Sequence, residues 1–118
     1  MGRYIVLYHA PVGVAERFAQ ATPEEAITGM QLWVGWHKKI GPALVDAGGP
    51  LGNAMRVAPG GVAKTDSNII GMSVLRAESM DDAFEMVMDH HHLHWAENCE
   101  ILVLEELPIP EMEVPSQQ

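Results

Sequence analysis

Hydrophobic and polar positions along the chain form alternating strand and helix patterns. Residues 3–9, RYIVLYH, are β-branched and aromatic and predict a strand that is apolar on both faces. Residues 10–21 predict a connection with at most one short helical turn. The motif TPEE at 22–25 then predicts a helix start, because it offers a capping threonine, a first-turn proline and a capping-box carboxylate.

This first helix is expected to run to about Asp46, just before Gly-Gly-Pro at 48–50. Positions separated by alternating steps of four and three predict its inward face, namely Ala26, Met30, Trp33, His37, Ile40 and Leu44. Pro42 cannot donate a backbone hydrogen bond to the carbonyl of Lys38. We therefore expect a kink or a break at Gly41-Pro42.

The second half of the chain adds three strands and one helix. The strands are predicted at 53–58, 68–77 and 99–107. A turn of hairpin character is predicted over 59–67, because it is rich in glycine and polar residues. The second helix is predicted to start at the cap Ser79 and to end near Asp89. Its apolar residues recur at helical spacing, at Met80, Ala83, Phe84, Val87 and Met88.

The order strand, helix, strand, strand, helix, strand predicts an α+β fold of the ferredoxin-like, split βαβ type. Right-handed crossovers and hairpin pairing then give an antiparallel sheet in the order 4-1-3-2, with both helices on one face. We assign residues 1–107 to this single domain. The segment 108–118 contains three prolines and is expected to be an extended or disordered tail.

The predicted strands lack a polar face. On the first strand, Tyr4, Val6 and Tyr8 oppose Ile5 and Leu7, and both sets are apolar or aromatic. Helices cover only one side of such a sheet, so the other side would expose an apolar surface. Two sheets that pack face to face would bury it, and we therefore expect a homodimer.

Composition and charge narrow the function classes. The chain of 118 residues carries a formal net charge of −9 and has no Lys/Arg cluster, which argues against a nucleic-acid partner. No window approaches the roughly 20 apolar residues of a membrane span, and the N-terminal segment is interpreted as a strand rather than a secretion signal. The single cysteine, Cys99, excludes an internal disulfide, and a reducing, cytoplasmic location is expected.

Several stretches resemble the YCII-related (DGPF-type) family over about residues 3–107. They are YIVLYHA at 4–10, DAGGPLG at 46–52, IIGMSVLRAESMDDAFEMVMDHHHL at 69–93 and EILVLEEL at 100–107. The resemblance implies a ferredoxin-like fold that assembles as a dimeric α+β barrel with a small-molecule pocket. It also implies acid–base work for His37 on the first helix and Asp89 after the second. Many relatives have a proline after this aspartate, where this chain has His90.

Both acid–base candidates also have a purely structural interpretation. His37 is either a partly buried helix residue with a bonded ring nitrogen, or a general acid or base, because imidazole titrates near neutral pH. Asp89 is either a solvated surface carboxylate or is held by a cationic partner, for which His37 or a nearby histidine would be natural. His37 stands about 22 Å from the helix start at ~1.5 Å per residue, so it meets Asp89 only if the helix overshoots the sheet or tilts.

The edge of the sheet supplies further binding candidates. In the predicted topology the first strand and the second helix end at the same edge, so we expect His9 to lie beside the segment 89–95. His92 and Trp95 of that segment, together with Trp33 of the first helix, are predicted to line the pocket. For Trp33, Trp36 and Trp95 alike, packing in the core or in an interface is the alternative to lining a pocket.

Four of the six histidines stand within 90–94. At a helix end, protonated histidines offset the negative end of the helix dipole. As a zinc site the spacing is poor, because His90 and His94 share a helical face only if the helix continues past Asp89. We predict no metal site and no cofactor.

Three functions fit these residues. The first is a dimeric protein that binds a small organic molecule, with His37 and Asp89 available for proton transfer in an enzyme. The second is a non-catalytic binding or regulatory module. The third is a cofactor-independent oxygenase of the kind this fold hosts, which rests on fold analogy alone. The residues leave open whether the protein is an enzyme and which ligand it binds.

Overall fold

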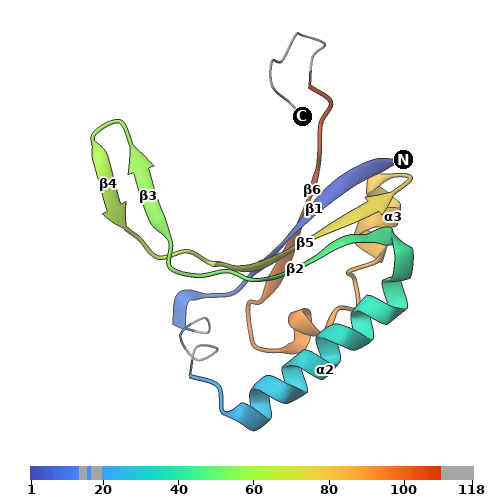
Figure 1. Cartoon of the computed structure of the whole chain (residues 1–118), viewed down its shortest axis with the longest axis horizontal. Coiled ribbons are helices and arrows are strands. Elements are labelled where there is room, and N and C mark those ends of the chain that lie inside the picture. Colours follow the sequence, from blue (N-terminus) through green and yellow to red (C-terminus); the bar gives the residue numbers. More distant parts are fainter. Residues whose placement is uncertain (14–15, 17–19, 110–118) are drawn as a thin grey trace.

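The structure is a computed structural model that describes residues 1–13, 16 and 20–109. It is an α+β fold built around an antiparallel sheet (Figure 1). The elements in chain order are β1 (Gly2–His9), α2 (Pro23–Ile40), the 3-10 turn η1 (Gly41–Ala43), β2 (Leu44–Pro50), β3 (Met55–Ala58), β4 (Gly61–Lys64), β5 (Ile69–Ala77), α3 (Met80–Glu85), the 3-10 turn η2 (His91–His94) and β6 (Glu100–Glu105). The predicted connection at 10–21 lies partly outside the described residues, and so does most of the predicted tail.

The main sheet has four strands in the order β2-β5-β1-β6, and every neighbouring pair is antiparallel. Tyr4 of β1 stands opposite Leu75 of β5 on one side and Glu105 of β6 on the other. The pairing of β2 with β5 is irregular. At Gly48 the backbone φ is 69°, and a Cβ there would lie 1.8 Å from the carbonyl oxygen of Met72, so only glycine allows this approach.

The first helix ends earlier than predicted. Both hydrogen bonds of the predicted capping box at Thr22 are present, and the helix ends at Ile40 instead of continuing to Asp46. Gly41 adopts a positive φ of 63°, and Pro42 lies in the 3-10 turn that follows. The break predicted at Gly41-Pro42 is therefore confirmed. It frees Leu44–Pro50 to leave the helix and pair with β5 as an edge strand.

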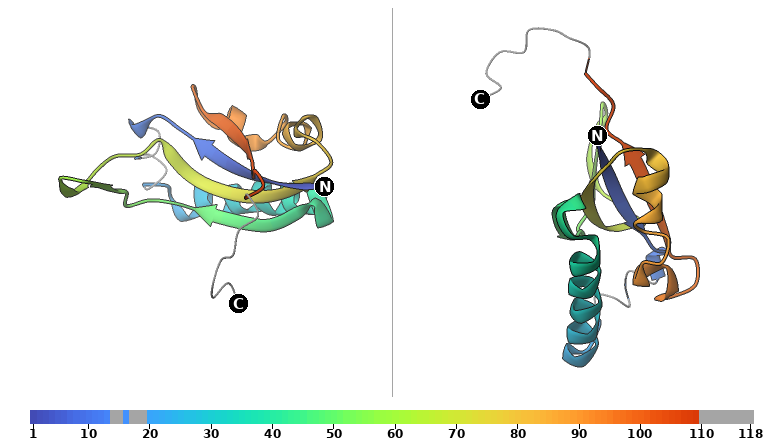
Figure 2. Two further views of the ribbon diagram at one scale, coloured as in Figure 1. Left: turned by 90° about the horizontal axis from the view of Figure 1, so that it is seen from above. Right: turned by 90° about the vertical axis from the view of Figure 1, so that its right-hand side faces the viewer.

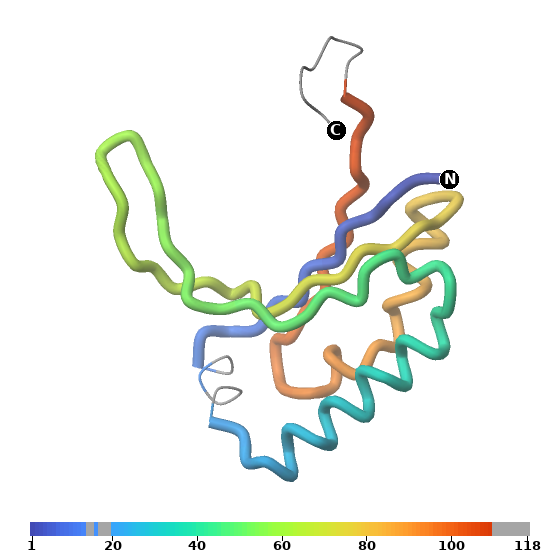
Figure 3. Tube along the Cα trace, in the orientation of Figure 1, coloured from blue at the N-terminus to red at the C-terminus, as the bar shows by residue number. Residues whose placement is uncertain are grey.

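The predicted strand at 53–58 lies outside the main sheet. Its described part, β3, pairs only with β4, and the two form a separate hairpin (Figure 3). All eight residues of these two short strands are exposed. A hairpin turn forms at 59–60, but the rest of the predicted turn contains strand β4, and β3 does not pair with β5. The second place in the sheet belongs to β2, whose first residues, 44–46, were predicted to be helical.

The core lies between the sheet and both helices. Tyr4, Val6 and Tyr8 of β1 share one buried cluster with Trp36 of α2 and Ala83 of α3. The predicted inward face of the first helix is wrong in its first half. Its Met30 is 62% exposed, because the first turns of α2 extend beyond the sheet (Figure 2).

The second helix is also shorter than predicted. Ser79 caps it as expected, through a hydrogen bond from the amide of Asp82, but the helix ends at Glu85. Turns then carry the chain to Asp89, and the four residues His91–His94 form a separate 3-10 turn. Among the described residues, no helix is both long enough and apolar enough to cross a bilayer.

Candidate functional site

Three segments meet under the C-terminal end of β1. They are the end of that strand, the part of α2 that carries Trp33 and Trp36, and the segment 89–95, which lies between the sheet and α2 (Figure 1). A hydrogen bond joins the first and the third, because Nε2 of His92 lies 2.7 Å from the carbonyl oxygen of His9. The proximity expected between His9 and the segment 89–95 is therefore observed.

Aromatic and imidazole rings fill the space between these segments. Trp33 stands in the middle, with five other ring centroids at 5.1–6.1 Å from its own. We call the whole set the ring cluster: Tyr8, Trp33, Trp36, His37, His90 and His91. Most of the pairs meet edge to face or tilted, which is the arrangement aromatic side chains prefer.

Two members of the ring cluster are fixed by hydrogen bonds. Nε1–H of Trp36 donates to the carbonyl oxygen of Met86 at 3.0 Å. The hydroxyl of Ser73 donates to the carbonyl oxygen of Ala47, so the Tyr8 hydroxyl donates in turn to Ser73 at 2.9 Å. Burial raises the pKa of Tyr8 to about 12, which keeps its phenol protonated at neutral pH. Both polar groups are satisfied and hold their rings in place.

His90 is the most buried imidazole of the cluster, with 1% of its surface exposed. Its Nδ1 accepts a hydrogen bond from the amide of His92 at 3.0 Å. Burial, assisted by the positive charges of His91 and His92 when they are protonated, lowers the pKa of His90 to about 3. The ring is therefore neutral at physiological pH, and since Nδ1 is the acceptor, its proton resides on Nε2.

Three imidazole nitrogens at this site are buried without a partner among the described residues. They are the Nε2 atoms of His9, His37 and His90. Buried polar atoms in proteins nearly always have a hydrogen-bond partner, and each exception calls for an explanation. His37 and His90 belong to the ring cluster, whereas His9 follows Tyr8 on β1 and is not a member of it. Two exceptions of one kind within one ring-lined region indicate a missing polar partner.

A groove of about 290 Å³ runs along the outer side of the ring cluster. We call it the α2 groove, and its lining residues are Gln31, Leu32, Gly35, Trp36, Lys39, Asp89, His90 and His91. Gly35 lies in the interior of α2, where glycine destabilises a helix by about 0.5–1 kcal/mol relative to alanine. A Cβ at Gly35 would meet no atom within 4 Å, so this glycine keeps the groove open.

Asp89 lies at the mouth of the α2 groove and is paired with Lys39, not with a histidine. Both side chains are more than half exposed. The hydrogen bond from the Lys39 ammonium, with its positive charge, lowers the pKa of Asp89, and the carboxylate is ionised at neutral pH. The structure records no hydrogen bond between Asp89 and His37, so the direct pair suggested by the sequence is not formed.

The remaining predicted site residues, Trp33, His37, His92 and Trp95, differ in how deeply they are buried. Trp33 and His37 belong to the ring cluster, with their ring centroids 5.2 Å apart. His92 is buried one layer further in, where burial lowers its pKa against the opposing effect of hydrogen bonds to the His9 and Glu100 backbones. Trp95 is 43% exposed and stacks on His92 at 6.4 Å, so it lies at the periphery.

Sequence reasoning missed part of this site. Tyr8 could have been predicted as a site residue from strand alternation. It lies on the same core face of β1 as Val6 and next to His9 in the sequence. Trp36 stands three residues after Trp33, which places the two on one side of a helix. Lys39 gave no signal, since its partner is fifty residues away in the sequence.

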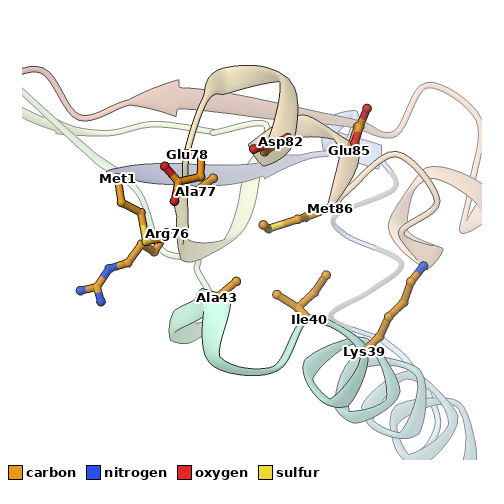
Figure 4. A pocket seen from close by; sticks show the side chains of 10 residues that line it. All are labelled: Met1, Lys39, Ile40, Ala43, Arg76, Ala77, Glu78, Asp82, Glu85 and Met86. Carbon is orange, nitrogen blue, oxygen red and sulfur yellow. The ribbon is translucent and has the colours of Figure 1, made fainter.

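A second and larger hollow lies at the other end of the sheet, between α3 and the end of α2 (Figure 4). Its volume is about 490 Å³, and we call it the α3 cleft. The cleft is lined by Met1, Lys39, Ile40, Ala43, Arg76, Ala77, Glu78, Asp82, Glu85 and Met86. The side chains of Ile40, Ala43 and Met86 form an apolar floor, while the carboxylates lie along the α3 side and the Arg76 guanidinium points away (Figure 4).

Neither hollow is a recognisable metal centre. In the part of the chain that the structure describes, no group of three or more His, Cys, Asp or Glu side chains is placed to hold a metal ion. Comparisons with protein-family models, curated proteins and solved structures give no match. The arguments about function therefore rest on the site itself.

Proposed function

We propose that this protein binds a small organic molecule in the α2 groove, against the ring cluster. The observation that carries the proposal is the unpartnered, buried Nε2 atom of His90, which lines the groove, together with that of His37 in the adjoining ring cluster. A ligand with oxygen or nitrogen acceptors would supply the missing partners, and the neighbouring rings would cover its apolar part. A groove of about 290 Å³ suits a molecule of one or two rings.

Proton transfer by His37 is the catalytic form of this proposal. Its Nε2 is buried and unbonded, so the nitrogen is free to exchange a proton with a ligand that reaches it. Asp89 would act through Lys39, by fixing the ammonium at the mouth of the groove. The alternatives are a binding or regulatory module, in which the same rings recognise a ligand without reaction, and an oxygenase-like enzyme, which fold analogy alone supports.

We further propose that the chain is a ferredoxin-like member of the YCII-related family and forms a dimeric α+β barrel. Two features support this: the strand order β2-β5-β1-β6, and a core in which α2 and α3 cover the same face of the sheet. The opposite face is apolar. Ile5 and Leu7 of β1 stand there between Met72 and Val74 of β5 and the half-exposed Leu102 and Leu104 of β6. A second copy packed on this face would bury it.

Two matched glycines of α2 test the ligand site. Gly35 lines the α2 groove and Gly29 does not, and at both positions a Cβ would meet no atom within 4 Å. We expect a metabolite library to contain compounds that raise the melting temperature of the wild type and of Gly29→Leu, but not of Gly35→Leu. Compounds that stabilise all three proteins equally would contradict a site in this groove.

The His37→Ala variant separates the catalytic form from the alternatives. If the protein is an enzyme that uses His37, the variant stays folded and binds the same compound but converts it at least about a hundredfold more slowly. A variant with unchanged turnover contradicts the role of His37. If no compound that binds is converted by the wild type, the protein is a binding module.

Light scattering tests the dimer. We expect the wild type to be a dimer and the double variant Leu102→Asp/Leu104→Asp to be a monomer, because two carboxylates would enter the buried face. The control is Val57→Asp on the β3–β4 hairpin, where the side chain is 77% exposed. A wild type that is monomeric at all concentrations contradicts the barrel.

A further inference from the structure

His90 differs from the other imidazoles of the site because its tautomer is fixed by the backbone. Its Nδ1 accepts the amide proton of His92, as an N-cap side chain does for the 3-10 turn that follows. The proton of the neutral ring must then be on Nε2. Nε2–H is therefore a donor that points in one fixed direction, and no described residue accepts from it.

Rings surround His90, and no described residue accepts a hydrogen bond from its Nε2–H. Rings of Tyr8, Trp33 and Trp36 stand with centroids 4.6–5.4 Å away, and His91 stacks on the ring at 4.3 Å. Leaving a buried donor without a partner costs about 1–3 kcal/mol, and asparagine would keep an acceptor for the His92 amide without this donor. The unpaired Nε2–H of His90 therefore calls for an acceptor from outside the described residues, such as a ligand atom.

We infer that His90 recognises a carbonyl or carboxylate oxygen of the ligand through its Nε2–H, and thereby selects for molecules that carry such an acceptor next to a flat apolar part. This inference rests on the proposed ligand site and names its ligand class. The flat part is required by the walls of the α2 groove, where the Trp36 and His91 rings flank His90. His91 is only partly buried, so its side chain can move aside when a ligand enters.

The charge state of His90 suits this role. Because burial holds its pKa near 3, the imidazole stays a neutral donor throughout the physiological pH range. A neutral donor can hold a carbonyl oxygen without giving up its proton. His37, His91 and His92 lie close enough to influence His90 electrostatically, and Asp89 is the one carboxylate whose charge opposes them.

Two substitutions at His90 separate the role of the Nδ1 acceptor from that of the Nε2–H donor. In His90→Asn, the amide oxygen takes the place of Nδ1 and still accepts from His92, but no donor reaches the position of Nε2. In His90→Gln, the amide nitrogen reaches the position of Nε2 and restores the donor. Near-ultraviolet circular dichroism from the three tryptophans checks that both variants keep the packed cluster.

The probes are acetophenone, benzoate and ethylbenzene, which share a ring and differ in the acceptor. We expect acetophenone or benzoate to bind the wild type and His90→Gln about tenfold more tightly than His90→Asn, as the loss of one hydrogen bond predicts. Ethylbenzene should bind all three proteins equally. Equal affinity of the oxygen-bearing probes for the wild type and His90→Asn, or no binding of them to the wild type, overturns the inference.

Nuclear magnetic resonance of the ring proton gives the independent readout. In the wild type, the Nε2–H signal of His90 should move downfield with acetophenone or benzoate and not with ethylbenzene. An upfield signal that none of the probes moves would show that Nε2–H donates to the face of a neighbouring ring, and it would overturn the inference. The Gly35→Leu and Gly29→Leu pair still tests the α2 groove in that case, so the two failures are distinguishable.

Discussion

The α2 groove and the α3 cleft are two hollows in the described part of the chain, and we place the proposed ligand site in the smaller one. The α3 cleft is larger, about 490 Å³ against about 290 Å³, and has an apolar floor with charged groups at its rim. Its carboxylates stand where water reaches them. The α2 groove adjoins rings whose nitrogens are buried, and two of these nitrogens, the Nε2 atoms of His37 and His90, lack a partner among the described residues.

The two hollows differ in whether their polar groups are exposed or buried, and not only in volume. An exposed charged side chain is solvated whether or not a ligand binds, so its presence gives no evidence of a ligand site. A buried donor or acceptor without a partner costs free energy in every folded molecule. Unpaired imidazoles therefore distinguish the α2 groove from the α3 cleft, and the following changes test that distinction.

The largest effect is expected at Trp36, whose indole is buried and bonded to the Met86 carbonyl. Trp36→Ala should lower the free energy of unfolding by about 3–5 kcal/mol in urea titrations. Glu85→Ala, at the rim of the α3 cleft, should change it by no more than about 0.5 kcal/mol. Similar effects of the two substitutions would mean that the ring cluster is not a packed core.

A pH effect of intermediate size is expected from His90. Its pKa is about 3 in the folded protein and near 6.5 when unfolded, so between these values the unfolded chain binds the extra proton. The stability from this residue is complete above pH 6.5 and is lost as the pH falls towards 3. Between pH 7 and pH 5 the loss should be about 2 kcal/mol.

The matched variants for this pH effect are His90→Asn and His94→Asn. His90→Asn removes the buried ring and should reduce the loss in the free energy of unfolding between pH 7 and pH 5. The second removes an imidazole that is already exposed in the folded protein and should leave the decline in place. If His90→Asn and the wild type lose stability in parallel, His90 is not the buried neutral ring described above.

The smallest effect is expected at the ion pair between Lys39 and Asp89, at the mouth of the α2 groove. Exposed ion pairs contribute little, because water and salt screen them. Asp89→Asn should shift the melting temperature no more than the control Glu97→Gln, which changes another exposed carboxylate. A large drop confined to Asp89→Asn would show that the pair is part of the structural core.

The sequence predicted those features that depend on neighbouring residues. The capping box at Thr22 and the cap at Ser79 are both formed, and the helix breaks where Pro42 requires it. The proximity of His9 to the segment 89–95 also followed, because a chain of alternating strands and helices brings these ends to one edge.

The features that failed depend on contacts between distant residues. The helix was predicted to continue to about Asp46 because Leu44 extends its apolar stripe, but Leu44–Pro50 pairs with β5, and that pairing decides its conformation. Met30 continues the apolar stripe of α2 but extends past the sheet that would bury it. Asp89 pairs with Lys39, which is fifty residues away in the sequence. The ring of His90 is oriented by the backbone amide of His92 in the 3-10 turn. Local sequence patterns predict neither contact.

The most direct test of the ligand site is a long-range proton–nitrogen spectrum of the histidine rings, recorded with and without a compound that stabilises Gly29→Leu but not Gly35→Leu. We predict that the Nε2 signals of His37 and His90 move on binding, while those of the exposed His94 stay in place. If such a compound binds and leaves His37 and His90 unchanged, the unpaired nitrogens do not mark the site and the proposal is wrong.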